Sequence, residues 1–549
     1  MKQIFLPLLL CLVAMTIFGG LSAQSQQLSQ DLIIEVDLSR LARDVQQIVA
    51  GEVTFAIAPL LPETSRFRSN WFIARPQRSV TMSTWDLAHH LVANNPAVVY
   101  AEPDDSYIAN YSGAPVADRS CEESNYTEDW PHPATVKFAW HLDAGFTQLR
   151  SARQDDGASK VRIAHCDTGY DPSHISTPKY LLAELQRNFI DGENQYSAVD
   201  IGSEGLLNQP GHGTSTLAVL AGNRAKRPQN NYDDYVGAAP FAEVVPIRVS
   251  RSVILYKSSA LVKALYYIME PQVHCDVLTM SMGGVASKYW ADAVNDCYEH
   301  GLVLVTAAGN NFGTLPTVNV VFPARFNRVI AVCGATYDQS PYFKYDVFSF
   351  KMQGNFGPQE VMSSAIAAYS PNMVWATMGC VDKFHLDGGG TSAATPQIAA
   401  AAALWLQKYQ GQQYEHPWQR VNAVRNALFS SAYKGTKDWH KYYGNGILRA
   451  KDALAIPPKL DAQPIEKDEV SFPIWTILFG SREDRSAQQR QMLAVELLRL
   501  EHNSPELQKL FAAIAATGQA TAEQKAQIRA AVAQLPYAST TVVQLLEGM

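Results

Sequence analysis

The sequence has no excess of basic residues and few charged residues of either sign. Its 549 residues include 45 Lys and Arg against 52 Asp and Glu, a formal net charge of -7, and charged residues make up 18% of the chain. Nucleic-acid-binding proteins concentrate Lys and Arg on one face, so this balance predicts no nucleic-acid partner. Hydrophobic residues make up 47%, which excludes a fibrous, collagenous or mostly disordered chain and indicates a globular protein.

Sequence patterns for metal binding and membrane spans are also missing. No His-Glu-x-x-His motif is present, and His89-His90 has no partner at a ligand spacing. We therefore predict no metal site, and no cofactor is required for the chemistry. The apolar run from Phe472 to Phe479 is far too short to cross a bilayer, so we expect no transmembrane span in the mature chain.

Residues 1–23 have the layout of a secretory signal. One Lys precedes an apolar stretch from Ile4 to Phe18, and small residues follow up to Ala23. This pattern predicts a signal peptide and a secreted or periplasmic protein, with an N-terminal membrane anchor as the alternative interpretation.

Cysteine is scarce, with seven in the chain. Removal of the predicted signal removes Cys11 and leaves six, which allow fifteen pairings in an oxidising compartment. Cys275 and Cys297 would close a short loop between a predicted strand and the following helix, and they are one candidate disulfide. The six are Cys121, Cys166, Cys275, Cys297, Cys333 and Cys380.

The rest of the chain divides into four segments. Residues 24–110 combine strand-like runs with a helix predicted over 84–94, which indicates a small α+β module. Residues 111–457 alternate short apolar runs with helices, which predicts an α/β fold with a doubly wound, mainly parallel sheet covered on both faces. Residues 458–485 are expected to be a linker. Residues 486–549 predict a helical extension with helices beginning near 486, 504 and 521, which packs on the main domain or on itself, or docks an unknown protein.

Three short motifs in the 111–457 segment each follow a predicted strand or begin a predicted helix. They are Asp167-Thr168-Gly169, Gly211-His212-Gly213-Thr214 and Gly389-Gly390-Thr391-Ser392. Each alone has a purely structural interpretation, as a turn Asp, a helix-capping His or an N-cap Ser. Together they supply the carboxylate, imidazole and hydroxyl that nucleophilic catalysis needs. We therefore predict a catalytic triad of Asp167, His212 and Ser392.

A fourth motif, Ala307-Ala308-Gly309-Asn310, follows another predicted strand, so the Asn310 amide could donate a hydrogen bond to an oxyanion. The chain order Asp, His, Ser differs from the orders of chymotrypsin-type enzymes and of α/β-hydrolases. With four motifs in this order, the segment from about 130 to 455 resembles the subtilisin-like serine peptidases (subtilases).

This resemblance implies a serine endopeptidase that acts on polypeptide substrates. It implies that His212 takes the proton of Ser392 while Asp167 orients His212, and that Asn310 stabilises the oxyanion.

The resemblance also implies that Ser281, Gly283 and Gly284 bind the substrate backbone as an added strand. The 24–110 module looks like the family's propeptide, which assists folding, inhibits the enzyme and is then cut away. Calcium often stabilises this family, but we assign no ligands for it. Because no Asp or Glu occurs from Asn311 to Arg325 and Met282 is apolar, we predict a preference for apolar residues at P1, the position before the scissile bond.

Two other functions are compatible with these motifs. The chain could be a binding or scaffolding protein with incidental chemistry, or a processing peptidase or exopeptidase with one dedicated substrate. The complete triad and Asn310 favour an active enzyme over a scaffold. The sequence does not identify the substrate.

Overall fold

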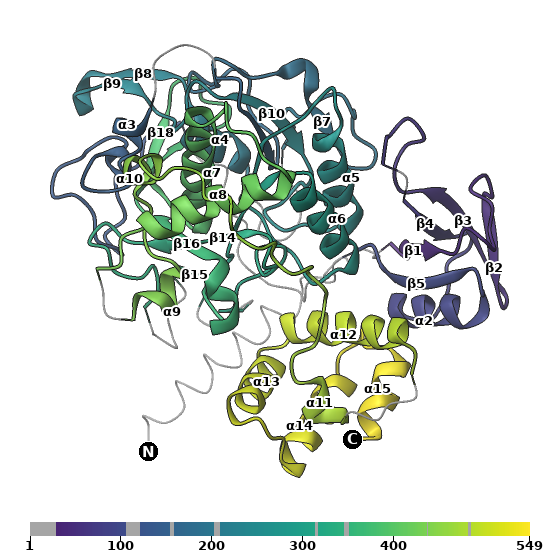
Figure 1. The fold of residues 1–549 in the computed structure, drawn as a ribbon. Coiled ribbons are helices and arrows are strands. Elements are labelled where there is room, and N and C mark those ends of the chain that lie inside the picture. Colours follow the sequence, from purple (N-terminus) through teal and green to yellow (C-terminus); the bar gives the residue numbers. More distant parts are fainter. Residues whose placement is uncertain are drawn as a thin grey trace, which may run out of the picture.

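The computed structural model describes residues 29–67, 69–105, 121–153, 159–202, 209–312, 317–344, 351–435, 438–480 and 485–549. The predicted signal peptide lies outside these residues, as do residues 106–120. Figure 1 shows three parts, namely an N-terminal α+β module, a large α/β domain and a group of C-terminal helices.

A seven-stranded parallel sheet forms the centre of the large domain. The strand order is β16-β14-β12-β11-β6-β10-β7, and each neighbouring pair is parallel. Parallel neighbours need crossover connections, which the intervening helices provide. The strands are β6 (Arg162–Asp167), β7 (Arg187–Asn188), β10 (Glu243–Arg248), β11 (Val277–Met280), β12 (Val303–Ala307), β14 (Ile330–Ala335) and β16 (Ala365–Tyr369).

Helices cover both faces of this sheet, because successive strand residues point to opposite sides and both sides are apolar. Ile163 of β6 belongs to the same core as α4 (His212–Ala221) and α7 (Thr391–Lys408). The next residue, Ala164, belongs to the core with α5 (Ser258–Met269) and α6 (Lys288–Glu299). The predicted α/β fold with a parallel sheet is confirmed.

Shorter elements complete the large domain. They are α3 (Leu149–Ala152), β8 (Arg224–Arg227), β9 (Tyr232–Tyr235), β13 (Asn310–Phe312), β15 (Met352–Gly354), β17 (Met373–Ala376), β18 (Phe384–Gly388), α8 (Pro417–Ser431), α9 (Trp439–Tyr443) and α10 (Ala450–Leu454), with 3₁₀ turns at Trp140–Leu142, Ala183–Leu185, Pro228–Asn230 and Gln359–Ser364.

The N-terminal module is a five-stranded antiparallel sheet in the order β2-β3-β4-β1-β5 with one helix. The helix predicted over 84–94 is α2 (Thr84–Asn94), which buries Trp85, Leu87, Ala88 and Leu91. The strands are β1 (Leu32–Val36), β2 (Gln47–Ala50), β3 (Val53–Pro59), β4 (Trp71–Pro76) and β5 (Val98–Pro103).

The C-terminal helices include the three predicted from the sequence and a fourth, α15, that was not predicted. Ser486, Ser504, Thr521 and Ser539 cap them, each accepting a hydrogen bond from a backbone N–H of the first turn. The helices are α12 (Ala487–His502), α13 (Pro505–Thr517), α14 (Ala522–Ala533) and α15 (Thr540–Glu547), preceded by the short α11 (Trp475–Phe479).

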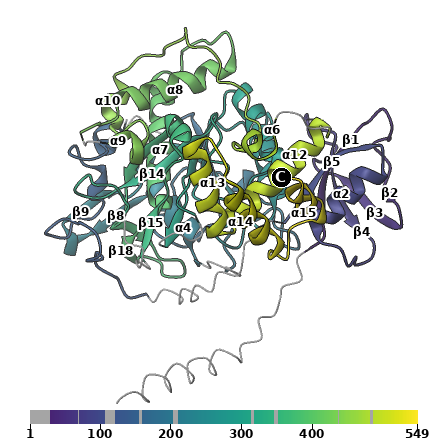
Figure 2. The same cartoon turned by 90° about the horizontal axis from the view of Figure 1, so that it is seen from below.

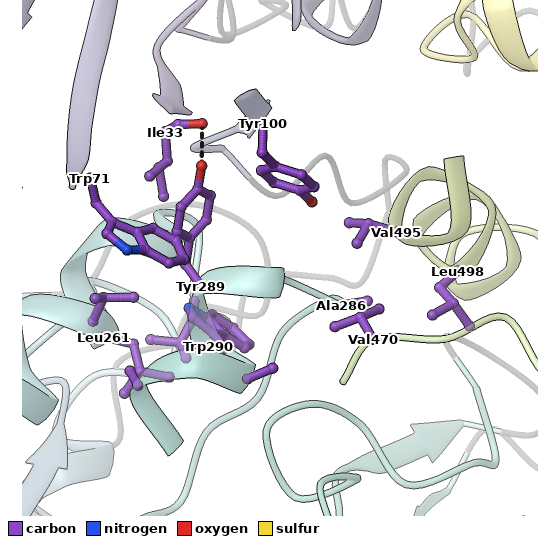
Figure 3. Packing of buried hydrophobic residues seen from close by; sticks show 14 of the residues in the cluster. Ile33, Trp71, Tyr100, Leu261, Ala286, Tyr289, Trp290, Val470, Val495 and Leu498 are labelled. Atoms are coloured by element: carbon purple, nitrogen blue, oxygen red, sulfur yellow. Dashed lines mark hydrogen bonds between the residues drawn. The ribbon is translucent and has the colours of Figure 1, made fainter. Parts of the chain in front are cut away.

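The three parts share one apolar core. Figure 2 shows the C-terminal helices beside both the N-terminal module and the large domain. In Figure 3, Trp71 and Tyr100 of the N-terminal module approach Tyr289 of α6, and Val495 and Leu498 of α12 lie near Ala286. The Tyr289 hydroxyl also donates to the Ile33 carbonyl at 2.9 Å.

One disulfide is present among the described residues, between Cys121 and Cys380. The suggested Cys275–Cys297 pair is wrong, because both thiols are free and buried in the apolar core that includes α5 and α6. Burial raises the pKa of both thiols well above its usual range, so these cysteines fill the core as small apolar side chains. Within the described part of the chain, no helix is long and apolar enough to span a bilayer.

Candidate active site

The three predicted triad residues come from the edge of the sheet where β6 ends and where α4 and α7 begin. Asp167 is the last residue of β6, His212 is the first residue of α4, and Ser392 is the second residue of α7. Gly213 permits the close approach of α4 to the loop after Asp167, since a Cβ there would lie 2.0 Å from the Gly169 carbonyl oxygen.

Asp167 and His212 form a buried hydrogen-bonded pair. His212 Nδ1 donates to Asp167 Oδ1 at 2.7 Å, and the side chains are 2% and 0% exposed respectively. The Thr168 N–H donates to the same oxygen at 2.7 Å. Burial alone would raise the pKa of Asp167, but the charge of His212 and its hydrogen bond, with smaller contributions from His165 and the Thr168 N–H, lower it below the usual value. The carboxylate is therefore ionised at neutral pH.

Two further polar residues, which no sequence motif indicated, extend this pair. The Thr216 hydroxyl lies 3.1 Å from Asp167 Oδ2, and His165 Nε2 lies 2.9 Å from the same hydroxyl. Burial is the main cause that lowers the pKa of His165 to about 4, so its imidazole is neutral. Their positions in the sequence could have indicated both residues. Thr216 follows His212 by one helical turn, and His165 lies on the same face of its strand as Asp167.

The Ser392 hydroxyl is held by the neighbouring strand end. It donates to the Ser281 carbonyl at 3.1 Å, and the Ser281 hydroxyl donates back to the Ser392 carbonyl at 3.0 Å. Among the hydrogen bonds of the described residues, none joins Ser392 to His212. Helices α4 and α7, which begin at His212 and Thr391, pack against each other, but the Ser392 hydroxyl must turn away from Ser281 before His212 can take its proton.

Asn310 is fixed against the loop that carries Ser392. Its side-chain oxygen accepts from the Thr391 N–H at 2.8 Å, and its Nδ2 lies against Gly390, where an added Cβ would be only 2.9 Å away. The Asn310 amide is thus oriented by its oxygen, with the Nδ2 donor beside Gly390, two residues before Ser392.

A cavity of about 100 Å³ lies beside Ser392 and Asn310. All three predicted substrate-binding residues line it, together with Asn310 and Ser392, and its other walls include Ile254, Met282, Val321 and His502. No Asp or Glu is among the described residues that line it.

The strand end at Ser281–Gly284 is already paired in this structure. The Gly283 carbonyl accepts from the Leu255 N–H at 3.0 Å, and the Gly284 N–H donates to the Phe322 carbonyl at 2.9 Å. A substrate strand that uses the Gly283 carbonyl would therefore share or replace its hydrogen bond with the Leu255 N–H.

Comparison with known proteins identifies the family. A model described as the subtilase family matches residues 158–446, more than half of the chain. The chain is 28% identical to Subtilisin DY of Bacillus licheniformis over 298 residues, covering 54% of this chain and 91% of that protein. It is 29% identical to a subtilisin of Bacillus pumilus over 315 residues, covering 56% and 97%. It is 27% identical to the minor extracellular protease Epr of Bacillus subtilis (strain 168) over 317 residues, covering 57% and 41%. The parallel sheet, the buried Asp–His pair and this match agree, and the chain belongs to the subtilase family of serine peptidases.

Proposed function

We propose that this chain is a secreted endopeptidase made as a zymogen, with Asp167, His212 and Ser392 as its catalytic triad and Asn310 as an oxyanion donor. The observations that carry the proposal are the buried 2.7 Å hydrogen bond between Asp167 and His212 and the cavity lined by Ser392 and Asn310.

The reaction begins when Ser392 Oγ attacks the carbonyl carbon of the scissile bond. Its proton passes to His212 Nε2, because Nδ1 is occupied by Asp167. His212 then gives this proton to the leaving amine, and the peptide C–N bond breaks to leave an acyl-enzyme. Water, activated by the same imidazole, releases the acid and restores Ser392.

Negative charge on the substrate oxygen is stabilised at the start of α7. The Asn310 Nδ2 group and the Ser392 N–H both lie at this point, and the helix N-terminus adds a favourable dipole. A donor fixed before the reaction costs no reorganisation when charge develops.

We assign residues 24–110 as a propeptide that inhibits the enzyme and 111–457 as the catalytic domain, with a linker over 458–485 and an extension over 486–549. Two carboxylates at the end of β5 support this assignment. Asp104 accepts from the Ser259 N–H and hydroxyl, both at 2.8 Å, and Glu102 accepts from the Ser287 hydroxyl at 2.6 Å and the Lys288 N–H at 3.1 Å. The propeptide therefore caps the N-termini of α5 and α6.

Secretion is proposed from three features. Residues 1–23 predict a signal peptide, the Cys121–Cys380 disulfide fits an oxidising compartment, and one relative is named as an extracellular protease. We propose polypeptides as substrates. The small net charge of the chain gives no strong electrostatic field that would steer charged substrates to the site.

The proposed chemistry uses no metal. The described residues include no group of three or more His, Cys, Asp or Glu side chains placed to hold an ion. We therefore assign no calcium ligand, and no step of the mechanism passes through one.

The test compares the full chain with Ser392→Ala, and with Ser363→Ala as a matched control at an exposed serine. We expect wild type and Ser363→Ala to be labelled by a serine-directed fluorophosphonate and to cut themselves near 104–120, and Ser392→Ala to do neither. An unlabelled, uncut wild type would support the scaffolding alternative. Cleavage of only one sequence from a peptide library would support a dedicated processing peptidase.

A further inference from the structure

Helix α12 lies outside the part of the chain that matches the family, which ends at 446, yet it is buried on nearly every side. Residues 492–500 are all buried, including Glu496 and Arg499. A helix that is covered all round is enclosed by more than one body. In this chain the enclosing bodies are the propeptide, the catalytic domain and the other C-terminal helices (Figure 2).

Arg499 joins the propeptide to the catalytic domain. Its Nη2 lies 3.0 Å from Glu102 Oε1, and its Nη1 donates to the Pro103 carbonyl at 3.0 Å. Its Nε donates to the Ala286 carbonyl, just before α6, at 2.8 Å. The Arg499 guanidinium therefore holds the last strand of the propeptide against the start of α6, which Glu102 caps.

A second set of contacts ties the C-terminal helices to α2 of the propeptide. Glu496 is fully buried and accepts from the Ser539 N–H at 2.7 Å and from its hydroxyl at 2.9 Å, and it lies 3.1 Å from His89 Nε2. The Thr540 N–H and hydroxyl both donate to Asp86 Oδ1, at 2.8 and 2.7 Å. The propeptide is thus held by α12 and α15 through its helix as well as through its strand.

The same helix ends at the substrate cavity. His502, the last residue of α12, lines the cavity beside Ser392. Next to it, Glu501 and Arg325 line a smaller cavity against the Phe322 loop. Helix α12 therefore both holds the propeptide and supplies part of one wall of the active site.

Departure of the propeptide would remove Glu102 from Arg499 and His89 from Glu496, and would leave Arg499 with only the Ala286 carbonyl among the partners named above. Removing one member of a buried charge pair is strongly destabilising, because the remaining charge stays desolvated. A cut between 104 and 120 breaks the chain but none of the contacts of Arg499, Glu496 or Thr540. The cut propeptide would therefore stay bound until the α12 contacts open.

We propose that residues 486–549 form a propeptide-binding clasp, which retains the cut propeptide on the catalytic domain and so delays activity. The occupant of its binding surface is the chain's own propeptide, through Glu102, His89 and Asp86. This inference rests on the proposed function in one respect, namely that residues 24–110 are an inhibitor.

The test measures propeptide release without relying on the chain's own activity. The full chain carries Ser392→Ala and a recognition sequence for a site-specific protease within 106–120. After that protease has cut it, size-exclusion chromatography follows the dissociation of the propeptide. We expect slow release from this chain and at least tenfold faster release with Arg499→Ala added. Arg490→Ala, at an exposed arginine of the same helix, should behave like the parent.

Glu496→Gln and Thr540→Ala cover the case in which Arg499→Ala does not fold, and both should also speed release. Equal release rates in the parent and in every folded clasp variant would overturn the proposal. Absence of fluorophosphonate labelling in the wild type would instead contradict the proposed function, so the two failures are distinguished. In the active enzyme, Arg499→Ala should shorten the lag before hydrolysis of a fluorogenic peptide.

Discussion

The Thr216 hydroxyl lies 3.1 Å from Asp167 Oδ2, the carboxylate oxygen that His212 does not use. The Gly213 carbonyl is the other acceptor within reach, at 3.2 Å. An ionised carboxylate is the stronger acceptor, so the Thr216 proton points to Asp167. The Thr216 oxygen then accepts from His165 Nε2, and Asp167 is held at both oxygens.

This contact predicts that Thr216→Val lowers kcat roughly tenfold, the worth of one hydrogen bond to a charged group, with little change in KM. Thr216→Ser keeps the donor and should restore kcat. An equal loss of kcat in Thr216→Ser, or a loss confined to KM in Thr216→Val, would show that the Thr216 hydroxyl does not act through Asp167.

Asn310 gives a second prediction. Asn310→Ala should lower kcat by roughly 100- to 1000-fold, a magnitude for which the general example is itself a subtilisin. KM should change little, because the donor acts on charge that exists only in the transition state. Steady-state kinetics on one peptide, normalised to fluorophosphonate-titrated sites, measure both constants. A loss confined to KM would mean that Asn310 binds substrate and does not stabilise the oxyanion.

The cavity predicts the preference at P1. Among its described lining residues, Ile254, Met282 and Val321 are apolar and none is acidic, so a buried Lys or Arg side chain would find no counter-charge. We expect peptides with Leu or Phe at P1 to be cut with higher kcat/KM than those with Lys or Arg. Matched fluorogenic peptides that differ only at P1 provide the measurement, and a clear advantage for the basic peptides would contradict the prediction.

The proposed triad could be assigned from the sequence because each proposed member belongs to a strong local pattern. Asp167 ends an apolar strand, and His212 and Ser392 follow glycines at the starts of helices. A parallel sheet then brings such positions to one edge. Thr216 had only the weaker signal of its spacing from His212, and a threonine in a helix is usually structural.

The contacts between the three parts could not be predicted in this way. Arg499 and Glu102 are 397 residues apart, and Cys121 and Cys380 are 259 apart. No local pattern selects such partners, since their approach depends on how whole modules pack. The suggested pairing of Cys275 and Cys297 failed for the same reason, because closeness along the chain was the only argument for it.

The disulfide predicts a measurable contribution to stability. Loss of the Cys121–Cys380 link in Cys380→Ser should lower the free energy of unfolding by about 2–5 kcal/mol. Urea unfolding of the Ser392→Ala chain, with and without reductant, measures this. Cys333→Ser is the matched control, since Cys333 is buried and free, and it should keep the response to reductant that Cys380→Ser loses. Equal midpoints for the oxidised and reduced parent would contradict the prediction.

Two buried neutral histidines predict that the fold weakens in acid. Burial is the main cause that lowers the pKa of His141 to about 3 and that of His165 to about 4, against about 6.5 in an unfolded chain. Protonation therefore favours the unfolded state. Each neutral histidine makes its full contribution to the free energy of unfolding above pH 6.5. This contribution is lost as the pH falls toward the pKa of that histidine in the folded state. The expected loss at pH 5 is about 2 kcal/mol for each histidine.

The environment of His141 makes it the better of the two to test. It is fully buried, neither ring nitrogen has a hydrogen-bond partner among the described residues, and Arg150 and Arg153 lower its pKa further. Among the described residues, no carboxylate acts on the pKa of His141 to offset a proton there. His141→Gln in the Ser392→Ala chain should therefore reduce the change in urea midpoint between pH 7 and pH 5. His300→Gln, at an exposed histidine, should leave that change as it is, and equal pH responses for the two variants would rule out His141 as a source of the acid sensitivity.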